Sequence, residues 1–120
     1  YGEMGVGKTT FVKYFINKFQ TDEKLKLTEV TSPTFNLLNE YETNHFMIKH
    51  YDLFRIKNIS EVKDLDIFEN NEKIITLVEW PQLLKNSNKA KKIDLFFKYE
   101  TIVSINGLCF GYSERNTSSV

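Results

Sequence analysis

The sequence predicts a three-layer α/β fold built on a mixed sheet. Three observations indicate this fold: a glycine-rich motif followed by an amphipathic helical pattern, two aromatic-rich segments with the pattern of a β-hairpin, and an apolar run that ends in a carboxylate. A chain of 120 residues with 41% hydrophobic content can bury one core. We therefore expect a single domain over residues 1–112, followed by a polar tail over residues 113–120.

The glycine-rich motif occupies Gly2–Thr9 and has the form of a glycine, four free positions and then Gly-Lys-Thr. This spacing is typical of a P-loop, in which backbone N–H groups of a loop of small residues converge on phosphate oxygens. The alternative is a glycine-rich turn that caps an ordinary helix. With a P-loop, we expect nucleotide contacts from six consecutive residues, Gly5, Val6, Gly7, Lys8, Thr9 and Thr10.

Two side chains of this motif carry the chemistry. Lys8 supplies a positive charge for the β- and γ-phosphates, and the Thr9 hydroxyl is a ligand for the Mg²⁺ that accompanies the nucleotide. The helix that they open adds its N-terminal partial charge. A strand normally precedes such a loop, but only Tyr1 stands before Gly2. We therefore expect a P-loop NTPase-like fold that lacks its N-terminal strand.

The next elements follow from periodicity and turn signals. Apolar residues at fourfold spacing predict a helix over Lys8–Phe19. Residues 27–30 are expected to form a short extended piece. Aromatic and aliphatic residues over Thr34–Tyr41 and His45–Leu53, separated by a polar pair, predict a β-hairpin.

The second half begins with a helix that we expect to start at an N-cap, Ser60, and to run to about Glu69, with a break near Asp66. Residues 73–78 have the pattern of a strand buried on both faces, which ends at Glu79 and leads into a short turn or helix. Closing strands are expected over residues 93–100, 101–106 and 108–112, with a tight turn at residues 106–107.

Acidic residues that end apolar runs are candidates for a site, because ligands gather at the carboxyl ends of strands in such folds. Glu79 stands where a P-loop protein places its second carboxylate on the Mg²⁺ side, and it could bind the metal or polarise a water. Its alternative is an acidic strand end that faces solvent. Asp52 is a second candidate, with a turn or cap residue as its alternative.

Four further residues bear on the site. Thr34 lies in a loop whose hydroxyl could sense a γ-phosphate. Trp80 could be a core residue, an anchor for a partner or a neighbour of adenine, and the sequence does not rank these. His45 and His50 are five residues apart in the hairpin, on opposite faces, so they do not form a metal pair.

Composition narrows the function classes. Basic and acidic residues balance at 16 each, which argues against direct electrostatic attraction to nucleic acid or a membrane. A single cysteine and the absence of a signal peptide or long apolar run favour the cytoplasm. Only Arg55 and Arg115 are arginines, so the chain is short of the residue that commonly clamps a transferring phosphoryl group.

Four blocks together resemble the bacterial TsaE family, formerly YjeE. They are Gly2–Phe11, Ser32–Phe35 with Asn39–Tyr41, His50–Arg55 and Val78–Pro81, in matching order and spacing. The resemblance implies a small P-loop ATPase that joins the TsaB–TsaD complex and supports addition of the threonylcarbamoyl group to adenosine beside the anticodon of certain tRNAs. Because the charges of the chain balance, we expect tRNA to be met only indirectly, through another protein.

The resemblance assigns a role to most of the candidate residues. Lys8 and Thr9 become the phosphate and Mg²⁺ residues, Thr34 becomes a switch-like threonine, and Asp52 becomes a water-activating or metal-side carboxylate. Glu79 and Trp80 become a Walker-B-like pair. The expected function is slow, partner-dependent ATP hydrolysis, with ATP and Mg²⁺ bound and Asp52, Glu79 and Lys8 as catalytic residues. Two alternatives remain: a small-molecule or nucleoside kinase, and a nucleotide-gated binding module that does not hydrolyse ATP.

Overall fold

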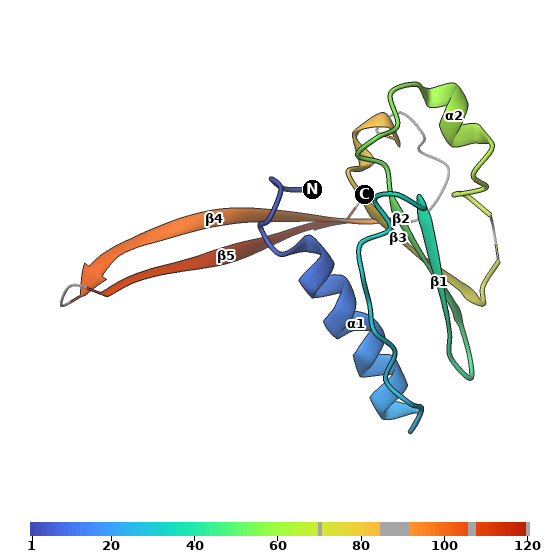
Figure 1. The fold of residues 1–120 in the computed structure, drawn as a ribbon, viewed down its shortest axis with the longest axis horizontal. Helices are drawn as coiled ribbons and strands as arrows, with labels where there is room; N and C mark the ends of the chain where they lie inside the picture. The colour runs from blue at the N-terminus through green and yellow to red at the C-terminus, as the bar shows by residue number, and fades with distance from the viewer. Residues whose placement is uncertain (70, 85–91, 106–107, 120) are drawn as a thin grey trace. The chain divides into compact units, whose positions relative to one another are not determined.

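A computed structural model describes residues 1–69, 71–84, 92–105 and 108–119. It divides into two compact units, one formed by Thr9–Ala90 and the other by Tyr1–Lys8 together with Lys91–Val120. Figure 1 shows the ribbon with its elements labelled. In the larger unit, helices lie against both faces of a mixed three-stranded sheet. The predicted α/β class with a mixed sheet is therefore confirmed.

The sheet of the larger unit consists of β1 (Leu38–Glu42), β2 (Met47–Asp52) and β3 (Ile74–Glu79), in that order. β1 and β2 are antiparallel, which confirms the predicted hairpin, although β1 begins four residues later than expected from the aromatic-rich pattern at residue 34. The delay has a local cause: the Leu37 N–H donates to the Pro33 carbonyl at 2.7 Å, and Leu37 has φ 65°, so the chain turns before it extends. β2 and β3 are parallel.

One face of the sheet is covered by α1 (Lys8–Asp22). The spacing of apolar residues predicted this helix, which continues three residues beyond the expected end at Phe19. Its inner face joins the sheet in a buried cluster of Val12, Ile16, Val30, Tyr41 and Ile48. The segment around Val30 is not a strand, but it contributes this one side chain to the core.

The other face of the sheet carries α2 (Ile59–Lys63) and the 3₁₀ helix η1 (Pro81–Leu84), packed around a second buried cluster of Tyr51, Leu53, Val62, Ile67 and Leu84.

The predicted N-cap of α2 at Ser60 is wrong. The cap is Asn58, whose N–H donates to the Glu61 carboxylate at 3.2 Å, so the helix begins one residue before Ser60. It also ends earlier than expected, at Lys63, while the positive φ of 49° at Asp66 marks the predicted break.

The prediction that residues 73–78 are buried on both faces is also wrong. β3 has β2 as its neighbour and is an outer strand of the described sheet, so its side chains before Glu79 are only partly buried. Within the described ranges, no helix is long and apolar enough to cross a membrane.

The smaller unit is a two-stranded antiparallel sheet of β4 (Ile93–Ile105) and β5 (Leu108–Ser119). β4 runs without interruption through the two strands predicted over residues 93–100 and 101–106, and β5 extends through the region predicted to be a loose polar tail. Both elements are longer than expected because each strand satisfies the backbone of the other, whatever the polarity of its side chains. The predicted turn at residues 106–107 lies outside the described residues.

A carboxylate just beyond α1 ties this helix to the hairpin turn. Glu23 Oε2 accepts the Asn44 N–H at 2.6 Å, and Glu23 Oε1 lies 2.7 Å from His45 Nδ1. The hydrogen bond with His45 is the main cause that lowers the pKa of Glu23 below its ordinary value of 4.5, and the Asn44 N–H adds to it.

Because the pKa of Glu23 is lowered in the folded chain, the ionised carboxylate stabilises the fold. This contribution is complete above the ordinary pKa of 4.5 and is lost as the pH falls through the pKa of the folded chain. We expect Glu23→Gln to have a lower free energy of unfolding than the parent at neutral pH, and we expect this difference to disappear in acid. Urea unfolding of both proteins between pH 3 and pH 7 measures this. A gap that stays constant to the acid end would contradict the assignment.

Candidate functional site

The glycine-rich motif forms a loop that leads directly into α1. Its turn is closed by the Val6 N–H, which donates to the Glu3 carbonyl at 3.3 Å. Gly5 and Gly7 have φ values of 78° and 106°, in the left-handed region that strains any residue with a Cβ. The loop therefore needs glycine at these two positions, and Val6 between them is buried.

Lys8 is buried and is directed back onto this loop. Its ammonium donates to the Gly2 carbonyl and, at 2.8 Å, to the Glu3 carbonyl. A Cβ on Gly2 would come within 2.8 Å of the Phe97 carbonyl oxygen of β4, so the start of the loop lies close against that strand. The cation is thereby held at the loop by backbone carbonyls of the smaller unit.

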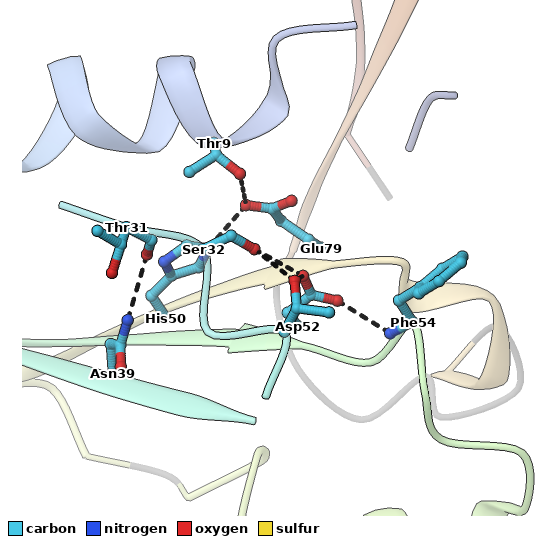
Figure 2. Close-up of polar contacts among 9 residues, drawn as sticks. Thr9, Thr31, Ser32, Asn39, His50, Asp52, Phe54 and Glu79 are labelled. Carbon is cyan, nitrogen blue, oxygen red and sulfur yellow. Dashed lines mark hydrogen bonds and ion pairs between the residues drawn. The ribbon is translucent and has the colours of Figure 1, made fainter. Parts of the chain in front are cut away.

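A second group of candidate residues lies within the larger unit. Thr9, the second residue of α1, donates from Oγ1 to Oε1 of Glu79 at 2.8 Å (Figure 2). Glu79 is the last residue of β3 and is only 6% exposed. It is therefore not an acidic strand end that faces solvent, which was the alternative to a site residue at this position.

Asp52 ends β2 directly opposite Glu79 in the parallel register. Its Oδ2 accepts hydrogen bonds from the hydroxyls of Ser32 and Thr34, both at 2.8 Å, and its Oδ1 accepts the Phe54 N–H at 2.9 Å (Figure 2). The contact with Phe54 is the turn-capping role that was the alternative for Asp52. The contacts with the Ser32 and Thr34 hydroxyls are not part of this capping role. They hold the loop that contains Thr34 against the end of β2.

Sequence reasoning missed His50 and Ser32 as members of this cluster. His50 is completely buried in β2, and its Nε2 lies 2.9 Å from Oε1 of Glu79. The spacing of two residues between His50 and Asp52 was the available signal, because it places both on one face of a strand. His45 lies before β2 and contacts Glu23, whereas His50 lies within β2 and contacts Glu79.

Two further predicted residues are Thr10 and Trp80. Thr10 is exposed, and its side chain makes no hydrogen bond with any residue that the structure describes. Trp80 follows Glu79 with a positive φ of 55°, and its ring packs 4.9 Å from that of Phe54. A strained backbone beside a buried carboxylate is a common feature of functional sites.

The oxygen donors of this cluster suit a hard cation such as Mg²⁺. Thr9 offers a hydroxyl and Glu79 a carboxylate, whereas the described residues contain no group of three or more His, Cys, Asp or Glu that could hold a metal by itself. Mg²⁺ is commonly bound by one or two protein oxygens with phosphates and waters completing its shell. The donor set therefore fits a metal that arrives with a nucleotide.

Comparison with known proteins identifies the family. The family model described as "Threonylcarbamoyl adenosine biosynthesis protein TsaE" matches residues 1–104. The chain belongs to the TsaE family. TsaE of Borreliella burgdorferi is 34% identical over 113 residues, which cover 88% of this chain and 77% of that protein. The resemblance inferred from the four sequence blocks is thus confirmed.

Other TsaE proteins are similar over a smaller share of their length. TsaE of Rickettsia bellii is 41% identical over 97 residues, which cover 81% of this chain and 65% of the relative. For TsaE of Rickettsia felis the covered share of the relative is 47%. The chain thus spans about half to two thirds of the length of these relatives. Each relative carries the name "tRNA threonylcarbamoyladenosine biosynthesis protein TsaE".

A solved structure has a similar fold. The crystal structure of YdiB from Bacillus subtilis superposes with a TM-score of 0.50 at 22% sequence identity, covering 80% of this chain and 54% of YdiB. At this identity the likeness shows the fold alone. It supports the mixed α/β arrangement described for this TsaE-family chain.

Proposed function

We propose that this chain binds ATP with Mg²⁺, hydrolyses it slowly, and supports threonylcarbamoyladenosine modification of tRNA together with TsaB and TsaD. The observation that carries the proposal is the 2.8 Å hydrogen bond between Thr9 and Glu79. It joins the first turn of the helix that follows the glycine-rich loop to the end of a sheet strand. In P-loop NTPases the Mg²⁺ of the nucleotide is held by a hydroxyl of the loop and by a carboxylate at a strand end.

In this proposal the Gly2–Thr9 segment is a P-loop. Backbone N–H groups around Gly5, Val6 and Gly7 bind phosphate oxygens, and Lys8 leaves its carbonyl partners to bind the β- and γ-phosphates. Thr9 and Glu79 hold the metal, Thr10 contacts the nucleotide, and Trp80 lies beside the adenine. Bound Mg²⁺ would supply neutralisation of the phosphate charge that develops as the γ-phosphoryl group leaves.

Asp52 orients and activates the attacking water in the proposed reaction. It is buried beside Glu79, and one of its oxygens is occupied by the Thr34 hydroxyl. Thr34 can therefore act as the switch-like residue: when it turns towards a γ-phosphate, it frees an acceptor position on Asp52 for water. Slow hydrolysis by the isolated chain follows, because this rearrangement must precede chemistry.

Scarcity of arginine supports dependence on a partner. One of the two arginines, Arg55, lies over the ring of Phe35 at 4.1 Å. In P-loop enzymes an arginine supplied by a partner can raise turnover by about 10³–10⁵-fold. We expect ATP hydrolysis to rise when TsaB and TsaD are added, whereas ADP release that requires an added small-molecule acceptor would identify a kinase instead.

Nucleotide binding is tested first by thermal unfolding of the purified chain with and without ATP and Mg²⁺. A ligand at about 100 times its dissociation constant stabilises the folded state by about 2.7 kcal/mol, which corresponds to a rise of several degrees. We expect this rise in the parent and its loss in Lys8→Ala, because the cation for the phosphates is gone. Lys13→Ala, at an exposed position of the same helix, is the matched control.

The results of these measurements distinguish an ATPase from a nucleotide-gated binding module. An equal rise in the parent and in Lys8→Ala would contradict the P-loop assignment. A rise with no turnover, even with TsaB and TsaD present, would identify a nucleotide-gated binding module rather than an ATPase.

A further inference from the structure

The alternation of side chains along β2 places a histidine directly beneath the two carboxylates. Ile48, His50 and Asp52 share the face that α1 covers, and Ile48 belongs to the buried cluster with the helix. His50 therefore stands between the apolar core and the site. Its exposed fraction is 0%, so bulk water does not reach it.

The imidazole contacts the same oxygen that Thr9 uses. Oε1 of Glu79 accepts the Thr9 hydroxyl at 2.8 Å and lies 2.9 Å from Nε2 of His50, while the other oxygen of Glu79 points away from both (Figure 2). When Glu79 is ionised it only accepts hydrogen bonds, and the hydrogen of this contact is then on Nε2 of His50. Two donors from different elements, α1 and β2, thus hold one carboxylate oxygen.

The second nitrogen of the ring argues that this contact is more than packing. Nδ1 of His50 is buried and has no hydrogen-bond partner among the described residues. Leaving a buried polar atom unpaired destabilises a fold, whereas an apolar side chain of similar size would fill the space without that penalty. What an apolar side chain could not provide is the hydrogen bond from Nε2 to Glu79.

We infer that His50 is a positioning residue that fixes the Glu79 carboxylate, and through it the Thr9 hydroxyl, for binding of Mg²⁺ with the nucleotide. The inference rests on the proposed function of Thr9 and Glu79. The imidazole does not touch metal or nucleotide. It restrains rotation of the glutamate side chain, so that the two oxygen donors are already paired before the metal binds.

Two amide variants separate this role from simple filling of space. In His50→Gln the amide nitrogen reaches the place of Nε2 and can donate to Glu79, whereas in His50→Asn it reaches only the place of Nδ1. Thermal unfolding is recorded for each protein with ATP in EDTA and with ATP over a Mg²⁺ titration. The readout is the Mg²⁺ concentration that gives half of the metal-dependent rise in melting temperature.

We expect His50→Asn to need about 10–100 times more Mg²⁺ than the parent, as is typical when the partner of a metal ligand is lost. His50→Gln should titrate close to the parent, and the rise caused by ATP in EDTA should be similar in all three. Equal half-saturation in the parent and His50→Asn, or an equal loss in both variants, would overturn the inference. If His50→Asn does not unfold cooperatively, the test rests on His50→Gln. A tenfold increase in the Mg²⁺ concentration that His50→Gln needs for half of the rise in melting temperature would also overturn the inference.

Failure of the proposed function gives a different pattern. A parent that shows no rise with ATP under any condition would overturn ATP binding, and the inference with it. A parent that responds to ATP and Mg²⁺, next to a His50→Asn variant that responds identically, would remove only the role of His50.

Discussion

Asp52→Asn is expected to lower ATP hydrolysis by about 10²–10⁴-fold, the usual contribution of a positioned general base. The substitution removes the negative charge and the basic oxygen but keeps the shape of the side chain. The remaining amide oxygen can still accept the Phe54 N–H, which Oδ1 binds at 2.9 Å. The new amide nitrogen can donate to the Ser32 and Thr34 hydroxyls, which can turn to accept. The fold and the loop should therefore be retained.

Single-turnover hydrolysis with TsaB and TsaD present measures the rate without the contribution of product release. The rise in melting temperature with ATP and Mg²⁺ is the companion measurement, and we expect it to stay near that of the parent. Asp66→Asn is the matched control, because it makes the same chemical change at an exposed residue. Hydrolysis by Asp52→Asn within a few-fold of the parent would leave Asp52 as a residue that only holds the Thr34 loop.

The elements that the sequence predicted well are those specified by local patterns. Apolar spacing alone indicated α1, and the alternation of aromatic segments with a polar pair indicated the hairpin of β1 and β2. The pairing of Asp52 with Glu79 at one sheet edge was also within reach, because both end apolar strands and the carboxyl ends of parallel strands meet at the same edge.

What was missed depends on register between distant segments. His50 meets Glu79 across 29 positions in the sequence, and Ser32 meets Asp52 across 20. The spacing of His50 and Asp52 places both on one face of a strand, but no local pattern says which distant residue either contact reaches.

The helix cap is a different case, because Asn58 is followed three residues later by Glu61, the spacing of a capping box, whereas Ser60 is followed by a lysine at that distance. Here a signal in the sequence was overlooked.

β4 and β5 show the limit of composition as a guide to strands. Polar residues after Ser113 predicted a loose tail, but the chain there pairs along its length with β4. A ladder of backbone hydrogen bonds does not require apolar side chains, so polarity alone does not exclude a strand.

Ile48→Ala is expected to reduce the free energy of unfolding by about 2–5 kcal/mol, the range for truncating a fully buried aliphatic side chain. Ile48 has an exposed fraction of 0% and pairs with Tyr41 of β1 on one side and with Ile75 of β3 on the other. It also packs in the cluster that includes Ile16 of α1. Three strands and the helix surround it, so the cavity could close only if they all moved.

Urea unfolding of Ile48→Ala and Ile48→Val measures the loss, with Ile59→Ala as the control at a residue that is 45% exposed. We expect a loss of about 0.5–1.5 kcal/mol for the valine variant and a smaller one for the control. A loss in Ile48→Ala no larger than that of Ile59→Ala would show that the described cluster is not the core. Ile48 lies two residues before His50 and four before Asp52 on the same face of β2, so the strand that packs in the core also carries two residues of the candidate site.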